Sequence, residues 1–407
     1  MFGGLRHGGL TVVEGDWVGY FGDPHKPLQA HIEVKHPRFY RRALLGGDVA
    51  LGEAWMDGDW ESLDLVAVIR LAVRNLDRLE NSHRLASGLA RAGNRLLHRR
   101  NGNTRQGSRN NIAVHYDLGN EFYRLFLDPS MAYSCAIFED AEEPLDVAQR
   151  RKFDRICRKL QLGPRDHLLE IGTGWGGFAL YAALNYGCRI TTTTISRRQY
   201  EYTADLLQRS GIGADRVRLL CEDYRDLQGQ FNKLVSIEMF EAVGLEHYDE
   251  FFGACDRLLD AEGCMLLQTI TMNERTFPQY RRNCDWIQKY IFPGAELASV
   301  AEIQRSLARV SNLSLYHMEE IGQHYAQTLA RWRSAFHRQR AQVRAQGFDE
   351  FFRRQWDYYF AYCEGAFRER HIGDAQLLLT RRSRRGALPG EEWMAAPSSA
   401  TADSSLA

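Results

Sequence analysis

The stretch from residue 167 to residue 177, His-Leu-Leu-Glu-Ile-Gly-Thr-Gly-Trp-Gly-Gly, most constrains how this chain can fold. Its apolar residues Leu168, Leu169 and Ile171 predict a short buried strand, and the apolar segment 178–186 predicts a helix directly after it. The glycines between them allow the backbone to turn sharply and to approach a ligand closely. A strand, a glycine-rich turn and a helix N-terminus predict a nucleotide-sized pocket at the carboxyl edge of a parallel sheet.

The spacing of the glycines differs from the dinucleotide-binding pattern G-x-G-x-x-G, which is followed by an acidic ribose ligand about 20 residues later. Here the order is E-x-G-x-G-x-G from Glu170, and the next predicted strand ends in Thr193 and Thr194. The loop resembles the first loop of class I S-adenosylmethionine (SAM) methyltransferases. On its own, such a loop also fits an ordinary tight turn.

Strand and helix patterns alternate in the rest of this region, which predicts an α/β fold with a parallel sheet covered on both faces. An irregular aromatic insert is expected after Thr271, followed by two long helices at about 323–345 and 348–369. The predicted strands are 167–172, 189–195, 217–223, 232–238, 263–271 and 376–380.

The N-terminal region follows another pattern. Alternating residues between 10 and 35 predict short antiparallel strands, and helical patterns follow at 37–45 and 63–97. Residues 99–111 contain no apolar side chain, which indicates a linker. We therefore expect a small N-terminal α+β domain (1–98), a basic polar linker (99–111), a catalytic domain (112–385) and a disordered tail rich in small residues (386–407).

Composition narrows the class of protein. A formal net charge of zero gives no reason to expect a nucleic acid partner. The eight cysteines form no C-x-x-C pair, so neither disulfides nor a zinc site are expected. No apolar run approaches about 18 residues, and the N-terminus does not resemble a signal peptide. A cytoplasmic protein is the expectation.

Several motifs, together with the glycine loop, resemble the cyclopropane fatty acid synthase family, which includes the mycolic acid cyclopropane synthases. The resemblance covers residues 112–382, and segment 51–60 is more weakly similar to members that act on bacterial phospholipids. The motifs lie at 115–120, 126–129, 133–136, 194–199, 236–244 and 290–294.

The resemblance implies a class I methyltransferase fold with a mostly parallel seven-stranded sheet. It also implies that a methylene group from SAM is added across the cis double bond of an unsaturated phospholipid. Because that substrate lies in a bilayer, the protein is expected to dock peripherally on the inner face of the membrane. Trp55, Trp60, the linker arginines and the Arg-rich helices after Tyr325 are candidate contacts. The resemblance leaves a homodimer open.

The same resemblance implies where SAM binds. Tyr133 and Ser134 would cover the cofactor, the glycine loop would contact its methionine part, and Gln199 would take the place of the acidic ribose ligand. For Thr194 and Tyr224, ordinary turn chemistry is the alternative. The implied cofactor-binding residues are Tyr133, Ser134, Gly172, Thr173, Gly174, Thr194, Ile195, Ser196, Gln199, Asp223 and Tyr224.

Family members hold a bicarbonate ion that removes a proton from the new methyl group. The resemblance implies that Cys135, Glu241, Tyr325 and the main chain of Ile237 hold bicarbonate here. Taken singly, Cys135 fits a buried structural thiol better, and Glu241 a charge at a helix N-terminus; only their joint occurrence in the motifs favours the bicarbonate site.

Two residues depart from the family pattern. Gln268 stands where the family has a His, and it can donate an amide proton but cannot be charged. Glu238 stands where members commonly have Gly. These departures leave open a methyltransferase that gives a methyl-branched or methylene product. A methyltransferase of a small soluble acceptor and an inactive SAM-binding or lipid-binding module are further alternatives.

Overall fold

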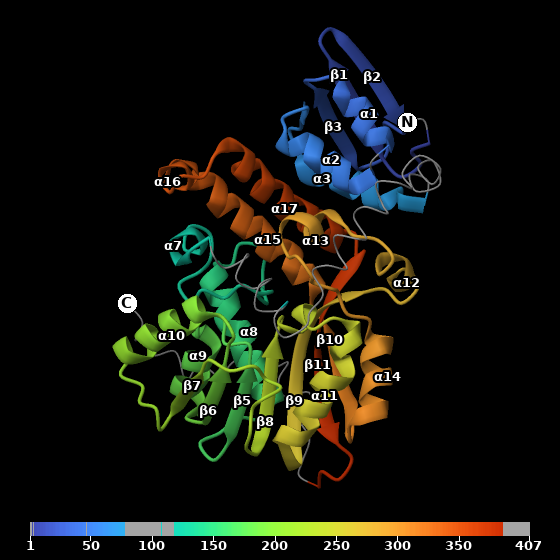
Figure 1. The fold of residues 1–407 in the computed structure, drawn as a ribbon. Helices are drawn as coiled ribbons and strands as arrows, with labels where there is room; N and C mark the ends of the chain where they lie inside the picture. Colours follow the sequence, from blue (N-terminus) through green and yellow to red (C-terminus); the bar gives the residue numbers. More distant parts are fainter. Residues whose placement is uncertain (1, 3, 46, 78–106, 108–117, 386–407) are drawn as a thin grey trace.

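The computed structural model describes residues 2, 4–45, 47–77, 107 and 118–385, which form two parts with one β-sheet each (Figure 1). The strands of the larger part are β5 (His167–Ile171), β6 (Arg189–Thr193), β7 (Val217–Leu220), β8 (Phe231–Ile237), β9 (Leu259–Met272), β10 (Leu313–Glu320) and β11 (Ile372–Arg381). They form one seven-stranded sheet in the order β10-β11-β9-β8-β5-β6-β7.

Strand β5 lies at a topological switch point. It pairs in parallel with β6 on one side and with β8 on the other, and β8 pairs in parallel with β9. Only β11 runs against its neighbours, between β9 and β10. Ligands bind outside the carboxyl ends of the strands at such a point. The structure confirms the expected class I α/β fold and places the glycine loop at this crevice.

Helices cover both faces of the sheet because side chains alternate between the faces along each strand. Leu266 and Leu378 pack on the face covered by α8 and α9, whereas Leu267 and Leu377 pack on the face covered by α11 and α14. The helices of this part are α7 (Asn120–Tyr123), α8 (Leu145–Lys159), α9 (Gly177–Tyr186), α10 (Arg197–Arg209), α11 (Tyr248–Leu258), α12 (Phe277–Tyr280), α13 (Trp286–Tyr290), α14 (Val300–Val310), α15 (Gly322–Arg338), α16 (Arg340–Ala345) and α17 (Glu350–Arg368).

The predicted strands all appear, with ends that differ by a few residues. Strand β10 is not predicted from the sequence, because most of its side chains are half-buried or exposed and its second half is mainly polar. The segment expected to be irregular also contains three helices, α12, α13 and α14. The helix predicted at 323–345 divides at Gln339 into α15 and α16.

The N-terminal part contains a four-stranded sheet with the order β2-β1-β3-β4. Its elements are β1 (Gly9–Glu14), β2 (Trp17–Gly22), β3 (Gln29–Val34), α1 (Arg38–Leu45), α2 (Gly47–Met56), β4 (Trp60–Glu61) and α3 (Leu65–Arg74). The antiparallel expectation holds for β1 with β2 but is wrong for β1 with β3, which pair in parallel. The reason is that the chain crosses from β2 to the far side of β1 before β3 begins.

The two parts pack closely where α17 meets the N-terminal part (Figure 1). The guanidinium of Arg354 on α17 donates to Glu61 Oε1 (2.6 Å) and to the carbonyl of Trp60 (3.0 Å), and Trp55 Nε1 donates to the Arg354 carbonyl (3.1 Å). Trp55 and Trp60 are both buried. The expectation that these tryptophans contact a membrane is therefore wrong, because both rings are buried, Trp55 against Arg354 of α17 and Trp60 within the N-terminal part. The predicted linker, apart from residue 107, and the tail lie outside the described residues.

Candidate active site

A cavity of about 1040 Å³ begins at the carboxyl ends of the central strands and continues to the N-terminal part. Gly172 and Gly174 of the glycine loop line one end, and Leu10, Ile32 and Leu71 of the N-terminal part line the other. Its size is at the upper end of small-molecule sites, which suits a nucleotide-sized cofactor together with an apolar chain.

The glycine loop exposes its backbone to this cavity. Gly172, Gly174 and Gly176 have φ of 103°, 54° and 84°, values that favour glycine. The amides of Gly172 and Thr173 both donate to the Thr193 carbonyl, at 3.1 and 3.0 Å, which fixes the loop to β6. A Cβ on Gly174 would meet no atom within 4 Å. The open side of Gly174 therefore leaves room for a ligand against the loop, and SAM fits this end of the cavity.

Ten of the eleven residues expected to bind SAM line the cavity. They are Tyr133, Ser134, Gly172, Thr173, Gly174, Thr194, Ile195, Gln199, Asp223 and Tyr224. Ser196 does not line it. Its hydroxyl accepts a hydrogen bond from the Gln199 amide (3.4 Å) and caps α10. The structure thus supports a structural role for Ser196. The other ten residues line the same cavity.

Two contacts prearrange the side chains near the predicted ribose and adenine positions. The Thr194 hydroxyl donates to Gln199 Oε1 (2.8 Å), so the amide nitrogen of Gln199 faces away from Thr194. Both carboxylate oxygens of Asp223 accept from Arg225, each at 2.8 Å, and the Arg225 guanidinium lies over the Tyr224 ring at 5.3 Å. Asp223 and Tyr224 therefore belong to one ordered turn beside the cavity.

Glu238 forms the centre of the opposite side of the site. Its carboxylate accepts three hydrogen bonds. Oε1 accepts from the Cys135 amide (2.8 Å) and from Gln268 Nε2 (2.8 Å), and Oε2 accepts from the Tyr325 hydroxyl (2.6 Å). Glu238 also lines the cavity, together with Ile237 and Tyr325. Three of the predicted catalytic residues thus converge on a residue that the sequence analysis treats only as a departure from the family.

The thiol of Cys135 hydrogen-bonds with groups other than Glu238, Asp374 among them. Its Sγ donates to the carbonyls of Ala136 (3.2 Å) and Ile321 (3.7 Å), and the residue is fully buried. Burial raises the pKa of the thiol well above its ordinary value. Cys135 therefore contributes its main-chain amide to the site while its thiol stays neutral in the core.

Glu241, on the short 3₁₀ helix η1 (Phe240–Ala242), is a second carboxylate at the cavity wall. Its Oε1 accepts from the Ile270 amide (2.5 Å) and from the Thr269 hydroxyl (2.9 Å). Its buried Oε2 has no hydrogen-bond partner in the part of the chain that the structure describes. Burial, followed by the charge of Glu238, raises the pKa of Glu241 to about 7.

The structure adds two charged residues that the sequence analysis does not name. Lys152 on α8 is fully buried, lines the cavity and donates to the Ser134 hydroxyl at 2.7 Å. Asp374 on β11 accepts from Gln268 Nε2 at 3.2 Å. Burial lowers the pKa of Lys152, and burial with the charges of Glu238 and Glu241 raises that of Asp374 well above its ordinary value.

A sequence signal for Lys152 did exist. Lys152 and Gln149 occupy the same buried stripe of α8 as Phe153 and Ile156, at helical spacing. Polar residues in an otherwise apolar stripe need partners inside the protein. No comparable local signal marks Asp374, because its contacts come from strands far away in the sequence.

Aromatic rings form much of the wall around these carboxylates. The Tyr133 and Tyr359 hydroxyls lie 3.0 Å apart, and the Tyr325 ring stacks on Phe367 with a centroid distance of 4.5 Å. The aromatic residues that line this part of the cavity are Tyr133, Trp175, Phe292, Tyr325, Tyr358, Tyr359, Tyr362 and Phe367. Ring faces attract a positive charge. The site can therefore hold an apolar chain, stabilise a cation on it and accept a proton from it.

Comparison with known proteins agrees with this geometry. Residues 103–377 match the family described as mycolic acid cyclopropane synthetase. The cyclopropane-fatty-acyl-phospholipid synthase of Escherichia coli K12 is 39% identical over 86% of this chain and 88% of its own length. The tuberculostearic acid methyltransferase UfaA1 of Mycobacterium tuberculosis is 36% identical over 84% of this chain and 81% of its own length.

A solved structure is also similar, that of mycolic acid cyclopropane synthase CmaA1 complexed with SAH and CTAB. It covers 67% of this chain and 98% of its own, with 32% identity and a TM-score of 0.62. This chain therefore belongs to the mycolic acid cyclopropane synthetase family, as a SAM-dependent methyltransferase of the cyclopropane-fatty-acyl-phospholipid synthase type.

Proposed function

We propose that this enzyme converts the cis double bond of an unsaturated phospholipid acyl chain into a cyclopropane ring, with SAM as the carbon donor. One observation carries the proposal. A single cavity joins the glycine loop to an apolar wall of the N-terminal part, and buried carboxylates and aromatic rings lie between the two ends. The similarity to the Escherichia coli phospholipid enzyme extends over both parts of the chain and supports the same substrate class.

In this proposal each end of the cavity has its own task. SAM, bound against Gly172 and Gly174, supplies an electrophilic methyl group. The aromatic wall that includes Tyr133 and Tyr325 excludes water and faces the positive charge that forms on the acyl chain. A buried carboxylate then accepts the proton that must leave before a ring can close.

The bicarbonate expected from the family fits this site poorly. The Cys135 amide, Gln268 and Tyr325, three of the groups that would hold it, already donate to the Glu238 carboxylate. We therefore derive no step that passes through bicarbonate.

A lipid methyltransferase that gives a methyl-branched or methylene product is the second candidate. The similarity to the tuberculostearic acid methyltransferase favours it, as do the two departures from the family pattern, Glu238 at the cavity wall and its hydrogen-bond donor Gln268. No observation favours a small soluble acceptor, and the ordered acid site argues against an inactive module.

Product analysis separates the two candidates. The enzyme is mixed with SAM and vesicles of unsaturated phospholipid, and S-adenosylhomocysteine release is measured together with the proton spectrum of the acyl chains. Cyclopropane protons with loss of vinyl protons support the first candidate. Exomethylene protons or a new methyl branch support the second, and no release with any unsaturated phospholipid would contradict both.

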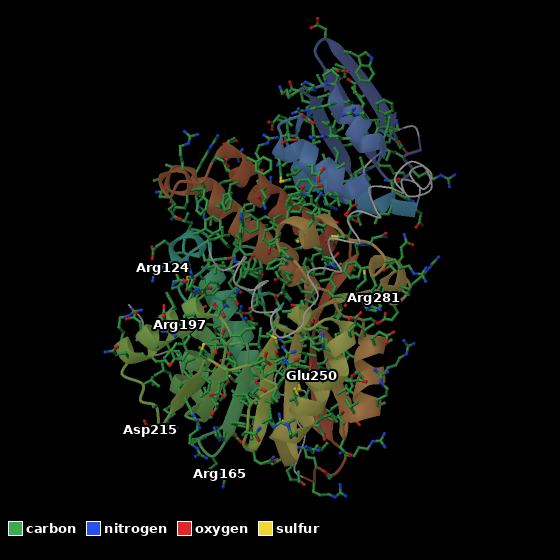
Figure 2. The ribbon with its side chains drawn as sticks, viewed as in Figure 1. Arg124, Arg165, Arg197, Asp215, Glu250 and Arg281 are labelled. Atoms are coloured by element: carbon green, nitrogen blue, oxygen red, sulfur yellow. The ribbon has the colours of Figure 1, made fainter. Side chains whose placement is uncertain are left out.

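We propose that membrane contact is peripheral and uses the N-terminal part. None of the helices in the described ranges is long and apolar enough to cross a membrane. Strand β2 exposes Trp17 and Tyr20, which are 51% and 77% exposed, and such aromatic side chains suit a membrane–water interface. Surface arginines of the larger part such as Arg124 and Arg197 (Figure 2) instead pair with Glu121 and Glu201.

Sedimentation with vesicles tests this contact. Replacing Trp17 and Tyr20 together by serine should weaken vesicle binding, while replacing exposed Leu184 on α9 by serine should leave it unchanged. Equal binding by both variants would remove β2 from the docking surface. The arginine linker lies outside the described residues, and its contribution stays a prediction, as does a homodimer.

A further inference from the structure

We infer that the carboxylate of Glu238 is the built-in base of this enzyme and occupies the place where its family holds bicarbonate. The inference rests on the proposed ring-forming function and goes beyond it, because it predicts that the reaction needs no added anion.

The hydrogen-bond donors around Glu238 carry the first step. A carboxylate offers about four lone-pair positions. Three are taken by the Cys135 amide, Gln268 Nε2 and the Tyr325 hydroxyl, all within 2.8 Å. The side chain also forms part of the cavity wall. The Asp374 side chain also hydrogen-bonds with Glu238. The three donors therefore hold the Glu238 carboxylate as they would hold a bound anion at the cavity wall.

The backbone at Glu238 explains how its side chain reaches this place. Glu238 follows β8 directly and has φ of 49°, in the left-handed region that favours glycine. Its amide donates to the Gln268 carbonyl at 2.8 Å, which ties the turn to β9. A non-glycine residue in this conformation is strained, and such strain persists where the surrounding structure holds the residue, as at functional sites. A glycine here would leave the three donors facing an empty space of carboxylate size.

The amide of Gln268 is held so that its NH₂ group points at Glu238. Its Oε1 accepts from Gln376 Nε2 (3.0 Å), and Gln376 Oε1 in turn accepts from Lys159 Nζ (2.8 Å). An amide donates without titrating. The change from His to Gln therefore suits a fixed carboxylate, because the neighbouring donor cannot compete for the proton that the carboxylate must accept.

The charges around Glu238 favour one ionised carboxylate. Burial raises the pKa of Glu238, whereas its hydrogen bonds from Tyr325, Cys135 and Gln268 and the charge of buried Lys152 act to lower it. Glu241 accepts hydrogen bonds on one oxygen only, from the Thr269 hydroxyl and the Ile270 amide. Neither of these groups donates to Glu238. Glu238 is thus the acid best held as an anion.

Ring formation transfers one proton from the new methyl group to Glu238. The alkene π pair forms a bond to the methyl carbon as the bond from carbon to sulfur breaks, with its electron pair left on sulfur. The neighbouring acyl carbon becomes positive. A C–H bond of the new methyl group then breaks, its electron pair closes the ring onto that carbon, and the proton goes to a Glu238 oxygen. Glu238 returns this proton to solvent after the lipid leaves.

Bicarbonate dependence is the direct test. Wild-type ring formation, measured in carbonate-free buffer and again with millimolar bicarbonate, should differ by less than about 2-fold. Glu238→Gly should lose about 100-fold or more without bicarbonate and regain at least about 10-fold with it, because the ion can then reach the three donors. A wild-type enzyme that loses activity when bicarbonate is removed would overturn the inference.

Glu238→Gln provides the second arm. Its amide keeps the space filled but cannot accept the proton, so activity should fall about 100-fold and bicarbonate should not restore it. The matched control is Glu364→Gln, which removes a buried carboxylate on α17 that does not line the cavity. Full activity of Glu238→Gln would exclude Glu238 as the base. Thermal unfolding and SAM affinity show that each variant is folded.

Binding of ¹³C-bicarbonate gives a readout that does not depend on turnover. Its NMR signal should stay sharp with wild type and with Glu238→Gln, and broaden with Glu238→Gly. Broadening with wild type would overturn the inference. If wild type releases no S-adenosylhomocysteine with any unsaturated phospholipid, the proposed function fails, and this experiment still decides what occupies the donors.

Discussion

The two ends of the cavity are built in different ways. At the cofactor end, the backbone forms the wall, with glycines at φ of 103° and 54° and loop amides bonded to β6. At the acid end, around Glu238 and Glu241, side chains form the wall. Glu238 accepts hydrogen bonds from Cys135, Gln268 and Tyr325, which lie 103, 30 and 87 positions away in the sequence. A local backbone shape follows from a short motif, whereas a network of side chains depends on the whole fold.

The ends also differ in what they cost the folded protein. At the cofactor end, Asp223 pairs with Arg225, and the buried Glu170 carboxylate accepts from the Thr192 hydroxyl. The acid end buries Glu238, Glu241, Asp374 and Lys152, and burial shifts the pKa of each toward its neutral form. Buried charges destabilise a fold unless they are paired and hydrogen-bonded. The buried charges of the acid end therefore lower the stability of the fold. Substitutions at the acid end should change stability and turnover, whereas substitutions at the cofactor end should change SAM affinity.

Gly174→Val should have the largest effect and should act on the cofactor end alone. The new side chain would point into the cavity at φ of 54°, so we expect SAM affinity to fall by about 100-fold or more. Titration calorimetry measures the affinity. Gly347→Val is the matched control, because Gly347 also has positive φ and open space but does not line the cavity. Unchanged SAM affinity in folded Gly174→Val would remove the cofactor site from this loop.

The same contrast explains what the sequence reveals. The glycine loop and its flanking strand follow from apolar spacing and from the conformational freedom of glycine. The role of Glu238 does not, because its partners on β9 and α15 become neighbours only when the sheet is complete. Trp55 shows the opposite error, since an aromatic residue in a small domain looks like a surface contact until α17 packs over it.

Glu241→Gln should lower turnover by about 10-fold or more with little change in SAM affinity, because its carboxylate lies at the acid end. It should also stabilise the fold. The folded pKa of about 7 lies above the ordinary value of 4.5, so wild type loses stability as the pH rises from about 4.5 to 7. Gln does not ionise, and the variant should gain about 1–3 kcal/mol at pH 8 but little at pH 4. Urea unfolding at both pH values measures this; an equal gain at both would contradict the pKa assignment.

Tyr325→Phe should lower turnover by about 10-fold, because it removes the 2.6 Å hydrogen bond to Glu238 Oε2. Loss of a donor to the ionised form raises the pKa of Glu238 further, so the acid limb of the pH–rate profile should move to higher pH. Lys152, Asp374 and Glu241 also act on this carboxylate and stay unchanged in the variant. A profile that falls in height but does not move would show that Tyr325 acts on the substrate and not on Glu238.

Substitutions of the Cys135 side chain should have the smallest effect, although this residue lies at the centre of the acid end. Only its amide donates to Glu238, whereas its thiol donates to the Ala136 and Ile321 carbonyls. Cys135→Ser keeps a hydroxyl donor for those carbonyls, and we expect turnover to fall by less than about 3-fold, with the pH–rate profile unmoved. Cys135→Ala should cost about 1 kcal/mol of stability through the lost packing and hydrogen bonds, again with little effect on turnover. A large loss of turnover in both folded variants would mean that the thiol itself contacts the reacting groups. Cys135 would then contribute its side chain as well as its main-chain amide to the acid end.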